Sequence, residues 1–135
     1  MRLATLALLL AAASAAGPDA EVLEHHGRWE SGYGAEFYNV VGRLRNTSGH
    51  ALRYVKLRIE ALDDHGKVVA STETYNESAE ALAVPDVDAK ALLASGKVKP
   101  LAAGAEERFG GSFLKEETPR LTEYRVKVVD TPAAK

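Results

Sequence analysis

The chain has 135 residues, which is enough for one domain and too few for two ordinary ones. With 46% hydrophobic and 27% charged residues, its composition is that of a globular protein and excludes general disorder. The formal net charge is −2 and no stripe of Lys or Arg stands out, which argues against nucleic acid and anionic membranes as partners. The absence of cysteine excludes disulfides, thiolate metal sites, a cysteine nucleophile and a lipoprotein anchor.

The N-terminus, residues 1–16, has the pattern of a secretory signal peptide. A positive charge at position 2 precedes the apolar run LATLALLLAAA, and small residues follow up to the turn former Pro18. The run is shorter than the about 20 apolar residues that a membrane span needs. We therefore expect cleavage after Ala15 or Ala16, export to the bacterial periplasm or cell exterior, and no stable membrane insertion after cleavage. Residues 17–22 are expected to form a flexible N-terminus.

The rest of the chain shows the hydrophobic period of β-strands. In residues 36–46, for example, the side chains of Tyr38, Val40 and Leu44 fall on one face of an extended chain. Turn-forming residues such as those of Asp63–Gly66 separate successive segments. The expected strands cover residues 22–30, 36–46, 52–63, 67–75, 107–114 and 122–130. Several short strands with turns between them predict an all-β, antiparallel β-sandwich of about seven strands.

The predicted domain spans residues 23–130 and is followed by a tail over 131–135. One long segment, residues 79–100, interrupts the strand pattern and is interpreted as an insert between two strands. Within it, residues 86–96 predict a short helix, because an Asp near the start can cap it, Ala and Leu favour it, and Gly96 can end it. Loops of this length are often functional, which makes the insert a candidate contact element.

Four stretches carry a family resemblance: VVGRLRNTSG, LRYVKLRIEALDDHGKVVAS, LAAGAEERF and YRVKVV. Together they are similar to the FxLYD domain family over about residues 38–129. In the segment IEALD at the name-giving position, only Asp63 matches the family motif, and the insert is not part of the family pattern. The resemblance implies an immunoglobulin-like β-sandwich of exported bacterial proteins, mostly without assigned activity. It therefore bears on fold more than on function.

The sequence offers no catalytic or metal-binding motif. The patterns G-x-S-x-G and H-E-x-x-H do not occur, and we expect a protein that is not an enzyme and uses no cofactor. His25 and His26 are adjacent and would point to opposite faces of a strand, while His50 and His65 fall in predicted turns. The acidic pair Asp63–Asp64 is better explained by hairpin formation than by calcium binding.

These patterns favour a non-catalytic binding or structural module whose partner is an unidentified protein of the bacterial envelope. Gly32–Gly34 is a flexible loop that presents Tyr33 as a candidate contact, whereas Trp29 and Tyr38 are interpreted as core residues. Candidate contacts in the insert are Asp86, Asp88, Leu92 and Leu93. The alternative is a periplasmic carrier of a small ligand or metal, which requires at least two histidines within a few ångströms of each other.

Overall fold

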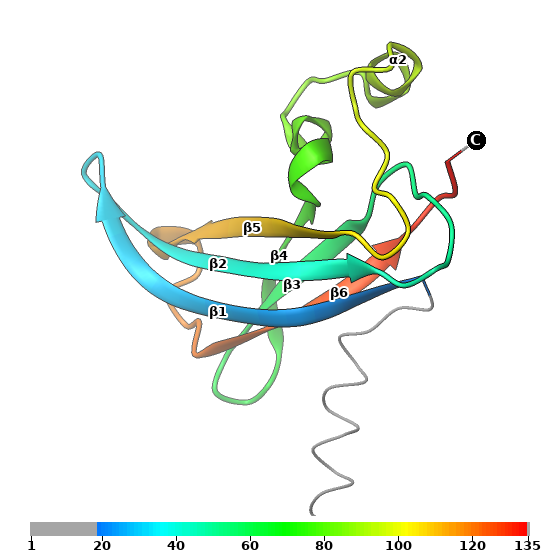
Figure 1. Cartoon of the computed structure of the whole chain (residues 1–135). Coiled ribbons are helices and arrows are strands. Elements are labelled where there is room, and N and C mark those ends of the chain that lie inside the picture. The colour runs from blue at the N-terminus through cyan, green and yellow to red at the C-terminus, as the bar shows by residue number, and fades with distance from the viewer. Residues whose placement is uncertain (1–18, 135) are drawn as a thin grey trace, which may run out of the picture.

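The computed structural model describes residues 19–134, which form two antiparallel sheets of three strands each (Figure 1). The first sheet has the order β1-β2-β5 and the second the order β4-β3-β6. The strands are β1 Ala20–Gly32, β2 Ala35–Asn46, β3 Lys56–Leu62, β4 Val68–Tyr75, β5 Glu106–Leu114 and β6 Glu123–Asp130. The all-β, antiparallel prediction is confirmed at this level, with six strands in the described part of the chain where about seven were expected.

In the first sheet, β2 is the central strand. It joins β1 through a hairpin whose turn residues are Tyr33 and Gly34 and whose flanking pair is Gly32 and Ala35. Both turn residues have positive φ, 52° at Tyr33 and 76° at Gly34. A two-residue hairpin favours this left-handed conformation because it matches the twist of the flanking strands. On its other side β2 pairs with β5 without a register shift.

In the second sheet, β3 lies between β4 and β6. The β3–β4 hairpin is closed by Asp63, whose Oδ1 accepts the backbone N–H groups of His65 and Lys67, both at 2.9 Å. These two bonds favour the charged carboxylate and hold the pKa of Asp63 below its ordinary value. Gly66 completes the turn with a φ of 75°. The turn predicted at this position is therefore confirmed, together with the role of its aspartate.

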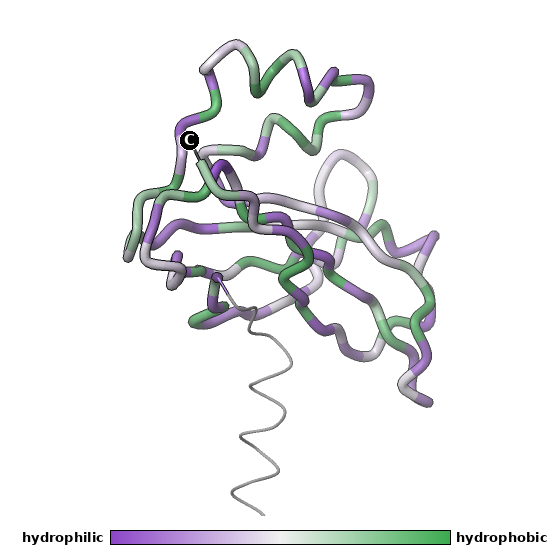
Figure 2. Tube along the Cα trace, turned by 90° about the vertical axis from the view of Figure 1, so that its right-hand side faces the viewer, coloured by the Kyte–Doolittle hydropathy of each residue, from purple (hydrophilic) through white to green (hydrophobic). Residues whose placement is uncertain are grey.

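The hydrophobic core lies between the two facing sheets. Along the strands, hydrophobic and hydrophilic residues alternate, and Figure 2 shows this as alternating colours on the tube. Burying one large aliphatic or aromatic side chain stabilises the fold by about 1.5–3 kcal/mol, so this shared core is what holds the sheets together. Its members from the strands of the first sheet are Ala20, Val40, Leu44, Phe109 and Phe113, and from those of the second Leu57, Ile59, Ala61 and Val126.

Gly42 in β2 allows the core to pack tightly. A Cβ atom built on Gly42 would lie 2.4 Å from the carbonyl oxygen of Glu24 and 2.7 Å from Cζ of Phe109. Neither neighbour is the far end of a flexible side chain, so any larger residue here would displace β1 or the aromatic ring. Gly110 is a contrasting case on the outer face of β5, where the nearest atom to such a Cβ is 3.4 Å away.

A buried asparagine just before the insert joins the segment that leads into β3 to β5. Asn76 is fully buried, and its Oδ1 accepts the backbone N–H of Val55 at 2.8 Å. Its Nδ2 donates to Oε1 of Glu107 in β5 at 2.9 Å. The amide thus satisfies a buried backbone donor directly before β3 and reaches a carboxylate of β5, as buried polar groups must.

The insert contains the helix that its sequence predicts over residues 86–96. This helix, α2, covers Ala89–Ala94 and is preceded by Asp88, whose carboxylate accepts the N–H of Ala91 at 3.1 Å. It ends before Gly96, which has a φ of 76°. Figure 1 shows α2 standing clear of both sheets, and none of its residues is buried.

The first part of the insert differs from expectation because it packs onto the domain. A 3-10 helix, η1, covers Glu77–Ala83 and buries Ala79 and Leu82. It contacts β4 and β5. Residues 79–100 are therefore two different elements, a packed 3-10 helix followed by an exposed α-helix. Ala and Leu favour helix, but their pattern here did not separate the two.

The prediction of a flexible N-terminus is wrong for the residues that the structure describes. Residues 17–22 are expected to be flexible, but in the described part of this range, residues 19–22, β1 begins at Ala20, which is fully buried and pairs with Asn46. The backbone oxygen of Asp19 also accepts the N–H of Thr47 at 3.0 Å. The signal peptide predicted for residues 1–16 lies outside the described residues. Within residues 19–134, no helix has the length and apolarity to cross a membrane.

The long strand expected over residues 52–63 is shorter than predicted. Leu52 is fully buried but lies in an isolated bridge position, paired with both Leu101 and Ala133. Between Leu52 and β3 the backbone is irregular, and regular pairing within a sheet resumes only at Lys56. The bridges at Leu52 bring the residue that follows the insert and the C-terminal segment together. The expected tail is tied down at this point by the N–H of Ala134, which donates to the oxygen of Ala51 at 2.9 Å.

Candidate functional site

The turn between β1 and β2 presents one fully exposed aromatic side chain. Tyr33 has a relative exposure of 107%, so its ring buries no surface against the domain. Its φ of 52° lies in the left-handed region, which is unfavourable for a residue with a large side chain. The cost is about 1–2 kcal/mol relative to ordinary backbone conformations. Tyr33 therefore contributes a conformational cost and no packing to the fold, a combination that marks functional positions.

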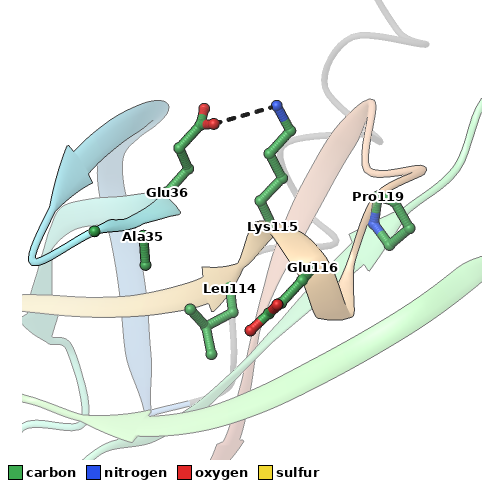
Figure 3. A pocket seen from close by; sticks show the side chains of 7 residues that line it. Ala35, Glu36, Leu114, Lys115, Glu116 and Pro119 are labelled. Carbon is green, nitrogen blue, oxygen red and sulfur yellow. Dashed lines mark ion pairs between the residues drawn. The ribbon is translucent and has the colours of Figure 1, made fainter.

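Beside this turn lies a cavity of about 410 Å³, lined by Gly34, Ala35, Glu36, Leu114, Lys115, Glu116 and Pro119. Figure 3 shows Glu36 and Lys115 reaching toward each other at its rim, where Lys115 Nζ and Glu36 Oε2 are 3.5 Å apart. Leu114 ends β5 and Pro119 follows the 3-10 helix η2, Lys115–Glu117. The cavity thus has apolar walls and a charged rim built by three segments of one end of the domain.

Lys115 links this cavity to an aromatic cluster between the sheets. Its Nζ lies 5.9 Å from the ring centroid of Trp29. Trp29 meets Tyr38 edge-to-face at 5.2 Å between centroids, and Tyr38 meets Tyr124 of β6 at 5.9 Å. Trp29 was interpreted as a core residue, but it is 40% exposed because β1 is an edge strand and no described strand continues the sheet beyond it.

At the inner end of this cluster, His25 and Tyr124 form a contact between the two sheets. His25 Nδ1 and the hydroxyl oxygen of Tyr124 are 2.6 Å apart. Burial raises the pKa of Tyr124 to about 12, with a further contribution from Tyr38. Burial lowers the pKa of His25, and the neighbouring charge of His26 adds to this. Both shifts favour neutral side chains, so the contact is a neutral hydrogen bond that fastens β1 to β6.

His25 and His26 point to opposite sides of the first sheet, as their adjacent positions in the sequence predict. The side chain of His25 meets Tyr124 on the inner side of the first sheet. His26 lines a shallow hollow with Arg43 and Arg108 on the other side. Near the β3–β4 turn, possible ligand atoms of Asp63, Asp64 and His65 lie within 4.8 Å of one another. This group contains one histidine, and its Asp63 already closes the hairpin.

The candidate contacts of the insert are distant from Tyr33. Asp88 is the N-cap of α2, and Asp86 is exposed with a positive φ of 67°. Leu92 and Leu93 are half-buried, and Leu93 borders a hollow of about 370 Å³. Figure 1 places α2 and the β1–β2 turn at different ends of the molecule. The sequence-based candidates therefore form two separate groups rather than one site.

Two features of the hairpin end were missed at the sequence level. Neither the cavity nor the contact between Lys115 and Trp29 could be found there, because 86 positions separate these two residues in the chain and nothing local links them. One signal in the sequence could have pointed to Tyr33: it precedes Gly34 in a two-residue turn, where asparagine is the common residue before glycine. Comparison with protein-family models, with curated proteins and with solved structures found no match. A function for this chain therefore has to be argued from its own sequence and geometry.

Proposed function

We propose that the chain is an exported, non-catalytic binding or structural module, and that its β1–β2 turn contacts another protein of the bacterial envelope. The observation that carries the proposal is Tyr33, an aromatic side chain that is fully exposed and held in a left-handed backbone conformation. Exposed Tyr is a frequent anchor at protein interfaces because it buries a large area at a small entropic cost. The cavity beside it, with apolar walls and a charged rim, extends the surface that a partner would cover.

The proposal includes an immunoglobulin-like arrangement of the sheets and membership of the FxLYD domain family. Two antiparallel sheets around a common core support the first, and the matching turn at Asp63 supports the second. Export depends on the signal peptide at residues 1–16. The mass of the mature protein from the periplasm or culture medium tests it, because cleavage after Ala15 or Ala16 predicts a chain beginning at position 16 or 17.

Site-specific photo-crosslinking in living cells tests the contact. A benzophenone-bearing phenylalanine analogue would replace Tyr33 in one strain and Val84 in another. Val84 is a matched control because it is 53% exposed and directly follows η1 in the insert, outside the β1–β2 hairpin. We expect a discrete adduct from position 33 that is not formed from position 84. Equal adducts from both positions, or none from position 33, would contradict the proposal.

A carrier of metal or small ligand has weaker support. The three-ligand group at Asp63, Asp64 and His65 is exposed at two of its members, and its three residues are consecutive in one turn. Structural zinc sites are closed by four ligands, whereas this group offers three, and Oδ1 of Asp63 already accepts two backbone N–H groups of the turn.

A further inference from the structure

The outer edge of β1 is a long unpaired strand edge. Within residues 19–134, β1 pairs with β2 alone, although it is 13 residues long. A register shift between Val22 and Glu24 interrupts its pairing near the start, so the regular part runs from Glu24 to Gly32. Every second residue of an edge strand directs its N–H and C=O groups away from the sheet, which makes the edge a template for another strand.

We propose that a second copy of this chain pairs with this edge in antiparallel fashion, with the two-fold axis passing at Trp29. The two first sheets would then join into one continuous sheet of six strands, from the three in each copy. In this register Arg28 lies opposite Glu30 of the second copy, and Glu30 lies opposite its Arg28. The pairing uses residues 26–32, which all lie in the regular part of β1.

Charge complementarity favours this register. Arg28 and Glu30 are both on the outer face of β1, and within one chain Arg28 Nη2 lies 2.9 Å from Glu30 Oε2. Pairing two copies would therefore produce an alternating group of two positive and two negative side chains. Opposite charges that face each other across strands stabilise a sheet, whereas like charges destabilise it.

The neighbouring registers are less favourable. An axis at Gly27 would place Glu24 opposite Glu30 of the second copy, and an axis at Arg28 would place that arginine opposite itself. An axis at His26 avoids like charges but leaves only the five residues 24–28 in regular pairing, because the register shift of β1 follows directly. The axis at Trp29 combines opposite charges with seven regular positions, 26–32.

The exposed tryptophan supports the same axis. Trp29 is one of the few large hydrophobic side chains of the described chain with 40% or more exposure, and it sits on the edge strand itself. At the proposed axis the two Trp29 side chains would meet across the strands, and aromatic pairs in this position stabilise sheets. The interface is separate from Tyr33, which lies in the turn beyond residue 32 and belongs to the proposed envelope contact.

Charge reversal tests the interface by sedimentation equilibrium on the full mature chain. Arg28→Glu replaces two opposite-charge pairs with two like-charge pairs, so we expect dimerisation to weaken by about tenfold or more. The double variant Arg28→Glu/Glu30→Arg restores complementarity and should recover the dimer. Arg120→Glu, an exposed change outside β1, should leave the dimer unchanged. A monomeric wild-type protein at all soluble concentrations, or a double variant as weak as the single one, would overturn the proposal.

Cysteine pairing then tests the register, because the natural chain has no cysteine to interfere. Directly opposite Cα atoms lie about 4.5–5.5 Å apart, within the range of a disulfide, whereas diagonal neighbours are about 7–8 Å apart. A mixture of Arg28→Cys and Glu30→Cys proteins should therefore cross-link to a mixed dimer on oxidation. Neither protein alone should do so at a comparable rate. Faster cross-linking of Arg28→Cys alone, or of His26→Cys alone, would refute the axis at Trp29.

Discussion

Replacing Tyr33 with asparagine should make the domain more stable. Tyr33 has a φ of 52° and full exposure, so the substitution removes no buried contact. Asparagine tolerates the left-handed conformation better than other residues with a side chain, and Asn-Gly is the preferred pair for this type of turn. We expect relief of most of the about 1–2 kcal/mol that the tyrosine costs. For a domain of this size, about 1 kcal/mol corresponds to about 3–5 °C in Tm.

Equilibrium unfolding in urea measures this effect, with Tyr33→Ala as the matched control. Alanine also removes the ring but keeps a Cβ that the left-handed region disfavours, so it should not stabilise the domain. The asparagine variant should unfold at higher urea with an unchanged slope, which reports an unchanged extent of unfolding. Equal midpoints for the two variants would refute the reasoning that the backbone conformation of Tyr33 is costly. In the photo-crosslinking strain, neither variant should reduce the adduct at position 33 when it is co-expressed as a competitor for the partner.

Three further predictions concern stability and are checked by the same unfolding measurement. Gly42→Ala should destabilise the domain by about 1–3 kcal/mol because its Cβ meets backbone and a buried ring, whereas Gly110→Ala should have a much smaller effect. Asn76→Ala should cost about 1–3 kcal/mol because it leaves a buried backbone N–H without an acceptor. The hydrogen bond from Arg125 lowers the pKa of Glu60 below its ordinary value of 4.5. The stabilisation that ionised Glu60 gives the fold is therefore present above that pH and is lost as the pH falls through the pKa of the folded state. Glu60→Gln should therefore be less stable than wild type at neutral pH, and the difference should close in acid; a constant difference would contradict the assignment.

The sequence predicts a strand correctly where one face of the strand is buried and the other is exposed to solvent. In β2 the buried residues Val40 and Leu44 alternate with exposed Arg43 and half-buried Arg45, so the period itself identifies the strand. The Asp63 turn was readable for a similar reason, since its chemistry is local. Both features depend only on residues that are neighbours in the chain.

What the sequence could not predict depends on contacts between distant segments. Leu52 looked like the start of a strand because it is apolar, but its partners Leu101 and Ala133 lie far along the chain. Trp29 looked like a core residue by size, yet its exposure follows from β1 being the edge of the sheet, which is a property of strand order. The burial of Leu82 likewise depends on η1 contacting β4 and β5.

The two candidate contact elements differ in how firmly the fold holds them, and this decides between them. The β1–β2 turn continues directly from β2, which is paired on both sides, so the backbone at Tyr33 is fixed by the register of the whole first sheet. Helix α2 buries none of its residues and is only six residues long, too short to be stable by itself. A partner that binds α2 would have to order it and lose affinity in doing so, whereas a partner that binds Tyr33 meets a backbone that the first sheet already holds in place. For this reason the turn, rather than the insert, is the surface on which mutation should affect binding first.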